Sequence, residues 1–228
     1  MFSTPLLPKD IDYDQVYEPA EDSFLLLDVF EKDCLMLKNH KFNNTVPLVV
    51  EIGIGSGIVT TFIHKYILQD SIFIGTDLNP FACKTSVKTD GLNIGKEEGI
   101  DLIQSDLVFP FITNSIDLLV FNPPYVPTEF VPPVPSENCF SEKKNKWLDL
   151  ALDGGSNGMV ITNNLLKNLK NYISKNGLVY LLFCERNNPT EVIKNFIKME
   201  NFLWEIELVL KRKCGWEVLS VYRFKKLV

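Results

Sequence analysis

The tetrapeptide Asn122-Pro123-Pro124-Tyr125 carries the clearest chemical signal in the sequence. The Asn122 side chain offers a neutral carbonyl oxygen as an acceptor, and Pro123 has no N–H, so its backbone contributes only a second acceptor. Two adjacent acceptors suit an NH2 group, and the Tyr125 ring could lie against a planar amide or a nucleobase. The tetrapeptide predicts a site for a planar NH2 compound, although a Pro-rich turn with a capping asparagine would have the same residues.

An unbroken apolar run, Leu118 to Phe121, comes directly before this tetrapeptide. Such a run is typical of a strand that is buried on both faces of a sheet. The two prolines that follow can neither extend the strand's hydrogen-bond ladder nor enter a helix. We therefore expect Asn122 to lie where a central strand ends and a rigid turn begins.

A glycine-rich turn follows a second apolar stretch, 48–52, and precedes a segment with helical periodicity, 58–68. Strand, glycine-rich turn and helix form the opening unit of a doubly wound sheet that binds a nucleotide-like cofactor. The third glycine comes one position early for a dinucleotide fingerprint, and an acid at the strand end would repel a pyrophosphate. The turn thus favours a cofactor with an ammonium or sulfonium group and no phosphate. Its candidate residues are Glu51, Gly53, Gly55 and Gly57.

Further acids follow the next two predicted strands. Asp77 closes the strand 72–77, where an acid is placed to bind both hydroxyls of a ribose, although it could also cap the helix that starts at Pro80. Asp106 follows the strand 100–105. Three strand ends closed by acids and a fourth closed by Asn122 would form one polar rim on one edge of the sheet.

The alternation of strand and helix patterns predicts an α/β fold with a doubly wound, mostly parallel sheet and a C-terminal antiparallel hairpin. The segment 126–146 is rich in proline and lacks periodicity, as is typical of a binding loop. The basic run Lys211 to Lys213 is expected at the solvated tip of the hairpin. The predicted strands are 48–52, 72–77, 100–105, 118–121, 177–184, 202–209 and 216–224, and the predicted helices are 20–37, 58–68, 80–92, 159–173 and 189–199.

The composition is that of an ordinary globular protein of 228 residues, which fits one domain. The formal net charge of −6 argues against binding nucleic acid through its phosphates and favours a protein substrate. No apolar run approaches the length of a membrane span, so we expect a cytosolic or nuclear protein. Five scattered cysteines and two histidines predict neither a disulfide framework nor a metal site.

With these residues named, the chain resembles the class I S-adenosylmethionine-dependent methyltransferases of the HemK group, over nearly its whole length, Tyr17 to Phe224. The specific features are the Glu-x-Gly-x-Gly-x-Gly turn and Asn-Pro-Pro-Tyr, and the sequence Tyr-Glu-Pro-Ala-Glu-Asp-Ser near the N-terminus resembles the short eukaryotic and archaeal branch. The resemblance implies a seven-stranded Rossmann-like sheet and S-adenosylmethionine as cofactor. It also implies N5-methylation of the glutamine in the Gly-Gly-Gln motif of the class I translation termination factor, and an obligate small zinc-binding activator protein.

The resemblance also implies residue roles. The glycine-rich turn would line the methionine side of the cofactor, Asp77 with Leu78 would bind the ribose, and Asn122 to Tyr125 would hold the target amide. A single domain, 1–228, would use its segment 1–45 to cover the cofactor site, while the loop 126–146 departs from the family pattern and is expected on the substrate side. The activator is expected along the edge strand Gly99 to Ser105. The remaining cofactor contacts would be Tyr17, Ser23, Asp106, Leu107 and also Asn122.

Three other functions stay open from the sequence. Asn-Pro-Pro-Tyr also serves methyltransferases that act on adenine or guanine amino groups of nucleic acids, because these too are planar NH2 groups. A protein lysine is another possible acceptor. A methyltransferase-like subunit that binds without catalysis is the third alternative.

Overall fold

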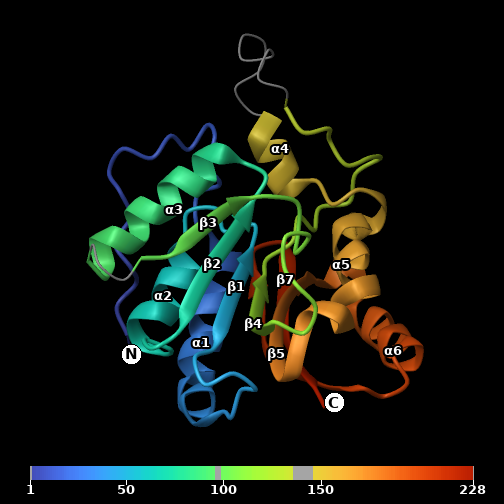
Figure 1. Ribbon diagram of the computed structural model, residues 1–228. Coiled ribbons are helices and arrows are strands. Elements are labelled where there is room, and N and C mark those ends of the chain that lie inside the picture. Colours follow the sequence, from blue (N-terminus) through green and yellow to red (C-terminus); the bar gives the residue numbers. More distant parts are fainter. Residues whose placement is uncertain (1, 96–98, 136–145, 228) are drawn as a thin grey trace.

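The computed structural model describes residues 2–95, 99–135 and 146–227. Its centre is a seven-stranded sheet with the order β3-β2-β1-β4-β5-β7-β6 (Figure 1). The five strands from β3 to β5 are parallel, whereas β7 runs antiparallel to β5 and β6 antiparallel to β7. This topology confirms the predicted fold class. The strands are β1 (Leu48–Ile52), β2 (Ile72–Asp77), β3 (Asp101–Gln104), β4 (Ile116–Phe121), β5 (Ile173–Cys184), β6 (Trp204–Cys214) and β7 (Glu217–Lys226).

Helices cover both faces of the sheet. Figure 1 shows α1, α2 and α3 on one side and α5 and α6 on the other, with α4 near the upper end of the sheet. None of the helices in the described ranges is both long enough and apolar enough to span a membrane. The helices are α1 (Glu21–Asn39), α2 (Ile58–Tyr66), α3 (Pro80–Asn93), α4 (Lys146–Leu152), α5 (Val160–Tyr172) and α6 (Pro189–Met199).

The central strand β4 contributes to both hydrophobic cores. Leu118 and Val120 pack into the core under α1 and α2, while Leu119 and Phe121 pack into the core under α5 and α6. All six residues of β4 are buried. Successive side chains of the apolar run before Asn122 face opposite buried layers, as predicted for a strand that is buried on both faces of the sheet.

Several elements differ from the sequence-based expectation. The strand expected at 177–184 begins earlier, at Ile173, and tolerates a polar stretch in which Asn176 has a positive φ of 59°. Helix α4 was not expected, and it begins where the predicted loop ends; residues 136–145 of that loop lie outside the described residues. The N-terminal helix was predicted at 20–37 and extends to Asn39.

The position expected for the basic run was wrong. Lys211 to Lys213 lie within β6, and the hairpin turn comes later, around Gly215, whose φ is +58°. Lys211 forms an ion pair with Glu185, and Arg212 forms one with Asp28 of α1. These two side chains therefore connect the hairpin to neighbouring elements instead of forming a free basic tip.

A buried carboxylate ties together the beginnings of three strands. Asp117 of β4 is fully buried, and its Oδ1 accepts a hydrogen bond from the Ser174 hydroxyl at 2.6 Å. Its Oδ2 accepts from Asn44 Nδ2 at 2.8 Å and from the Leu48 backbone N–H at 3.0 Å. Asp117 thus fixes β1, β4 and β5 at the ends of the strands opposite Asn122.

We expect Asp117→Ala to lower the free energy of unfolding by about 2–4 kcal/mol, because it leaves the buried Ser174 hydroxyl and the partly buried hydrogen bonds from Asn44 and Leu48 without their acceptor. Asp101→Ala removes an exposed aspartate from β3 and is the matched control, with an expected change within about 0.5 kcal/mol. Urea unfolding followed by circular dichroism measures both. Equal midpoints for the two variants would contradict this role of Asp117.

Candidate active site

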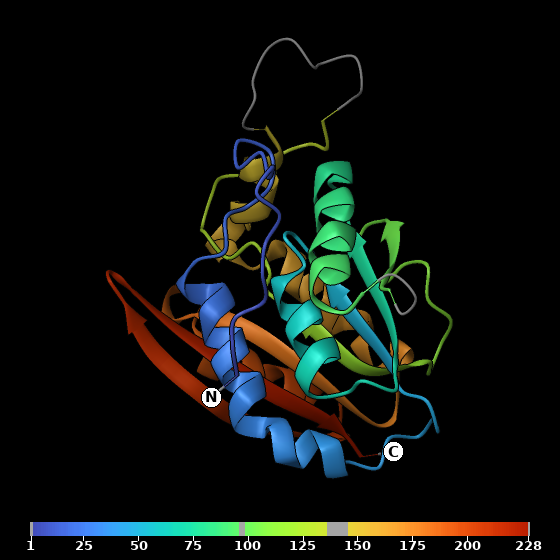
Figure 2. The same ribbon diagram turned by 90° about the vertical axis from the view of Figure 1, so that its left-hand side faces the viewer.

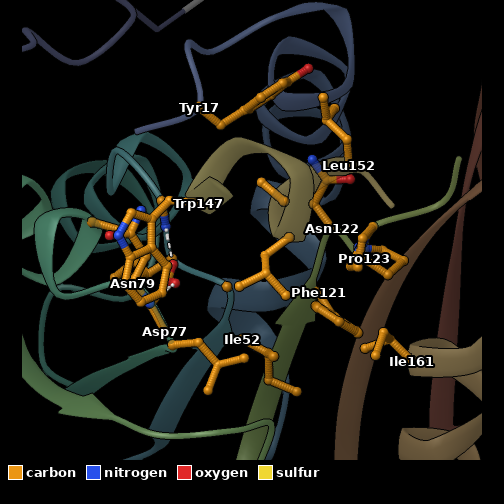
Figure 3. A pocket seen from close by; sticks show the side chains of 18 of the residues that line it. Tyr17, Ile52, Asp77, Asn79, Phe121, Asn122, Pro123, Trp147, Leu152 and Ile161 are labelled. Carbon is orange, nitrogen blue, oxygen red and sulfur yellow. Dashed lines mark hydrogen bonds between the residues drawn. The ribbon is translucent and has the colours of Figure 1, made fainter. Parts of the chain in front are cut away.

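A cavity of about 280 Å³ opens at the carboxyl ends of the parallel strands. Figure 3 shows Asp77 and Asn79 on one side of it, Asn122 and Pro123 on the opposite side, and Tyr17 above them. Ligands of open α/β sheets bind at this edge, because the strand order reverses there between β1 and β4. The structure brings these predicted residues together along the lining: Tyr17, Ser23, Glu51, Gly53, Gly55, Asp77, Leu78, Asp106, Leu107, Asn122, Pro123, Pro124 and Tyr125.

Gly57 is the one predicted site residue outside this lining. Its φ is +79°, and a Cβ at this position would lie 2.7 Å from the Ser86 Cα of α3. Gly57 therefore lets α2 approach α3 closely and turns the chain into α2, which is a packing role.

The Asn122 amide makes one hydrogen bond and leaves its acceptor free. Its Nδ2 donates to Asp22 Oδ2 at 2.9 Å. Its Oδ1 is buried and has no hydrogen-bond partner in the part of the chain that the structure describes. A buried acceptor without a partner is costly, and in a cavity lining it is explained by a ligand that donates an N–H or O–H group.

The turn that contains Pro124 and Tyr125 is held by residues from far along the chain. Asn187 Nδ2 donates to the Tyr125 carbonyl oxygen at 2.9 Å. Side chains at Gly154 and Gly158 would collide with the Pro124 and Tyr125 carbonyl oxygens, respectively. The close approach of these two glycines and the Asn187 hydrogen bond fix the backbone of the turn, so little ordering entropy is lost when a ligand binds.

The Tyr125 phenol is fixed as well. Its hydroxyl donates to Glu217 Oε2 at 3.2 Å, across to the first residue of β7. Burial raises the pKa of Tyr125, and the nearby carboxylates of Asp22 and Glu217 raise it further. The phenol is therefore neutral over the physiological range and acts as a hydrogen-bond donor with a defined ring position.

The glycine-rich turn and Asp77 form one hydrogen-bonded unit. Gly53 and Gly55 both have positive φ angles, +63° and +53°, which glycine adopts without strain. The Gly55 N–H donates to Asp77 Oδ2 at 3.0 Å, and the Asn79 N–H donates to Asp77 Oδ1 at 2.9 Å. Asp77 lines the cavity, so its carboxylate can also accept hydrogen bonds from hydroxyl groups of a ligand.

Glu51 is a buried carboxyl beside this turn. Burial raises its pKa to about 8, and hydrogen bonds from the Thr60 N–H and hydroxyl offset part of that shift. At neutral pH the side chain is largely protonated when nothing compensates its charge. A cationic group in the cavity would favour the ionised form.

Two segments cover the cavity from outside the sheet. Tyr17 and Ser23 line it from the N-terminal segment and the first turn of α1. Burial raises the pKa of Tyr17, and the neighbouring Asp22 raises it further. The Pro-rich segment contributes Val131, Pro132 and Val134. These residues narrow the access to the cavity.

Several lining residues were missed from the sequence. Helix α4 and the residues after it contribute Trp147, Leu152 and Ile161 (Figure 3). The run Lys-Trp-Leu-Asp-Leu-Ala-Leu consists mostly of good helix formers, so its composition could have indicated a helix. Asn187 contacts the turn only through tertiary structure, and no local pattern marks it. Asp22 lies in the sequence Tyr-Glu-Pro-Ala-Glu-Asp-Ser, but nothing in that pattern indicates its contact with Asn122. Among the described residues, no group of His, Cys, Asp and Glu is arranged to hold a metal ion.

Comparison with known proteins shows two relatives that align over nearly the whole chain. The chain is 35% identical over 217 residues to Methyltransferase HEMK2 of Homo sapiens, covering 94% of this chain and 91% of the relative. It is 34% identical over 237 residues to the eRF1 methyltransferase catalytic subunit mtq2 of Schizosaccharomyces pombe, covering 100% and 97%. No protein-family model matches the chain.

Solved structures share the fold. The E. cuniculi Mtq2-Trm112 complex, which is responsible for the methylation of the eRF1 translation termination factor, has a TM-score of 0.63 to this chain. The sequence identity is 23%, and the match covers 93% of this chain and 99% of that one. At this identity the likeness establishes a common architecture.

The raised pKa of Glu51 predicts a pH-dependent stability. Between pH 4.5 and about 8 the folded chain keeps a proton that the unfolded chain has lost, so the free energy of unfolding falls as pH rises. The contribution of this group approaches about 1.4 kcal/mol per pH unit within that window. Glu51→Gln should remove this part of the slope. Urea unfolding at pH 5, 6, 7 and 8 measures it, and parallel curves for both proteins would refute the assignment.

Proposed function

This chain belongs to the family of the HEMK2 and Mtq2 methyltransferases, and we propose that it methylates the N5 nitrogen of a glutamine in a protein. The proposed substrate is the Gly-Gly-Gln motif of the class I translation termination factor, since the S. pombe relative is the catalytic subunit of an eRF1 methyltransferase. Termination takes place in the cytoplasm, so this substrate also supports the predicted location. The observation that carries the proposal is the buried, partnerless Oδ1 of Asn122 in the cavity lining.

The proposed cofactor is S-adenosylmethionine, which supplies a sulfonium-bound methyl group when it is bound. The residues on the other side of the cavity fit it. Asp77 presents an oriented carboxylate that could accept from ribose hydroxyls, and Glu51 provides a carboxyl whose ionised form a cationic ligand would favour. Gly53 and Gly55 leave the backbone open to close approach. Asp106 and Leu107 line the cavity where the adenine would lie.

The target amide would be oriented by the Asn122 turn. A carboxamide nitrogen is a weak nucleophile because its lone pair is delocalised, so the chain has to hold it in line with the methyl group. Asn122 Oδ1 and the Pro123 carbonyl oxygen would accept its two N–H groups, and the Tyr125 ring would lie against its plane. Positioning of this kind lowers the activation free energy by several kcal/mol, and by about 7–11 kcal/mol in the best intramolecular reactions. The same acceptors stabilise the positive charge that develops on nitrogen.

The proposed organisation of the chain follows from these contacts. Residues 1–228 would form one methyltransferase domain, in which the segment 1–45 covers the cofactor site through Tyr17 and Ser23. The loop 126–146 would face the substrate, as supported by Val131 and Val134 in the cavity lining. Its residues 136–145 lie outside the described part of the chain.

The proposed partner is a small activator protein, equivalent to the Trm112 chain in the E. cuniculi complex. The edge strand β3, within the segment 99–105, is the proposed contact. The Ser105 N–H donates inward to the Asp77 carbonyl oxygen, so by the alternation of parallel strands the N–H groups of Leu102 and Gln104 point outward. Exposed apolar side chains of the adjacent α3, Val87 and Leu92, would extend this surface. A strand of the partner could pair along it.

We expect Asn122→Ala to lower kcat for the release factor by at least about 100-fold. The substitution removes the Oδ1 that would accept a hydrogen bond from the target amide and hold its nitrogen in place. The dissociation constant of S-adenosylmethionine, measured by calorimetry, should change little. Asn163→Ala, an exposed asparagine of α5, is the matched control and should keep full activity. Transfer of labelled methyl groups to release factor, DNA, RNA and histone would be assayed in parallel. Full activity of Asn122→Ala, or transfer to nucleic acid or lysine alone, would overturn the proposal.

The edge-strand contact predicts a specific effect of proline. Gln104→Pro removes one outward N–H without touching the bonds to β2, so it should weaken Trm112 binding at least about tenfold while the chain still folds. Gln104→Ala keeps the backbone N–H and serves as the control. Co-expression followed by affinity co-purification measures complex yield. Equal yields with both variants would place the partner elsewhere.

A further inference from the structure

Asp22 contacts the catalytic turn but is not one of the residues expected to bind cofactor or substrate. It lies in the first turn of α1, 100 positions before Asn122, with only 4% of its surface exposed. Its Oδ2 accepts the hydrogen bond from Asn122 Nδ2, as described above. Its Oδ1 accepts from the Ser23 N–H at 2.6 Å and from the Ser23 hydroxyl at 3.3 Å. Both oxygens of this buried carboxylate are therefore used.

The contact decides which end of the Asn122 amide is available to a ligand. A primary amide has a donor end and an acceptor end, and its terminal torsion allows both orientations. An ionised carboxylate only accepts hydrogen bonds, so the NH2 end of Asn122 must face Asp22. The acceptor end, Oδ1, is then left without a partner in the described structure. Asp22 thus determines that Asn122 presents a hydrogen-bond acceptor, and not a donor, to a ligand.

Asp22 itself is held in place on more than one side. The N-terminal end of α1 favours a negative charge, and the Ser23 N–H fixes one carboxylate oxygen. Tyr17 and Tyr125 lie close enough for the charge of Asp22 to raise the pKa of both phenols, after the larger effect of burial. Asn122 is fixed by the buried strand β4 on its other side. The backbone positions of both partners of the Asp22–Asn122 hydrogen bond are therefore fixed.

We propose that Asp22 is a positioning residue that makes the site selective for an NH2-bearing side chain by holding Asn122 Oδ1 toward the target. The inference rests on the proposed function, because it takes glutamine as the target. A side chain with the shape of glutamine but without N–H donors would leave the acceptors unpaired. Sites built on such hydrogen bonds reject the analogue strongly.

Asp22→Asn tests the inference because its expected effect has a direction. The Ser23 N–H still requires an acceptor, so the new side chain keeps its oxygen there and turns its NH2 toward Asn122. Asn122 would then have to rotate, presenting Oδ1 to residue 22 and its own NH2 to the target. The variant should lose its preference for a target side chain with N–H donors and gain affinity for a target side chain that offers only an acceptor.

The probes are two neutral peptides, one with Gly-Gly-Gln and one in which the glutamine is replaced by glutamate γ-methyl ester. The ester keeps a carbonyl acceptor, has no N–H donors and carries no charge, so simple repulsion by Asp22 does not enter. The full-length chain co-expressed with Trm112 is used. The wild type should bind the glutamine peptide at least about 100-fold more tightly than the ester, measured as KM against the inhibition constant.

In Asp22→Asn the ratio of the ester's inhibition constant to the KM of the glutamine peptide should fall below about tenfold. The kcat for the glutamine peptide should fall at least about tenfold, while the dissociation constant of S-adenosylmethionine stays unchanged. Asp33→Asn is the matched control: it changes another buried carboxylate of α1, which accepts from Tyr180 and Arg223 and does not line the cavity. It should lower thermal stability but leave the peptide ratio at the wild-type value.

The outcomes separate the two proposals. A wild type that methylates the glutamine peptide, together with an Asp22→Asn variant of unchanged peptide ratio, overturns this inference and leaves the proposed function intact. A wild type that transfers no methyl group to glutamine overturns the proposed function. If Asp22→Asn does not fold, Asp22→Ala replaces it, because either amide orientation is then open and the ratio should again fall; an unchanged ratio there overturns the inference.

Discussion

The burial of β4 on both faces is the constraint on which the site depends. A strand whose successive side chains enter two different cores cannot shift by one residue, because that shift would exchange the two sets of side chains. Asp117 fixes its beginning through three hydrogen bonds, and Asn122 comes one residue after its end. The position of the Asn122 amide is therefore set by the core of the whole molecule, and the adjacent loops add little freedom.

The second constraint is electrostatic. Glu51 and Asp22 are buried and Asp77 is half-buried at the same end of the sheet, and the folded chain has to stabilise these carboxyl groups. Backbone N–H groups of Thr60, Gly55, Asn79 and Ser23 do so, each as a donor to one of these carboxyls. These bonds also fix the oxygens in space, so the groups that would receive a cationic, hydroxyl-bearing cofactor are already oriented before it binds. The positive charge of such a ligand would offset the desolvation that raises the Glu51 pKa.

Much of this arrangement could be predicted from local sequence. The strands β1, β2 and β4 contain apolar runs, and each has a polar residue in or directly after its last two positions, Glu51, Asp77 and Asn122, that the parallel topology brings to a common edge. What could not be predicted depends on contacts between distant segments. Asp22 reaches Asn122 across 100 positions, and Asn187 reaches Tyr125 across 62. Helix α4 follows a segment without periodicity, and the hairpin strands were expected to be shorter because exposed charged residues interrupt their apolar pattern.

The C-terminal hairpin shows how such distant contacts affect the site. Strand β7 pairs with β5 through residues 219–225 and begins at Glu217, and Figure 2 shows the hairpin (red) passing behind α1 (blue), which it contacts. Glu217 then accepts the Tyr125 hydroxyl, while Arg212 of β6 pairs with Asp28 of α1, the helix that carries Asp22. The Tyr125 phenol is thereby held by a carboxylate of β7, and the Asn122 amide is held by a carboxylate of α1. The hairpin thus reaches both Tyr125 and α1 through its side chains, although no residue of β6 or β7 is part of the cavity lining.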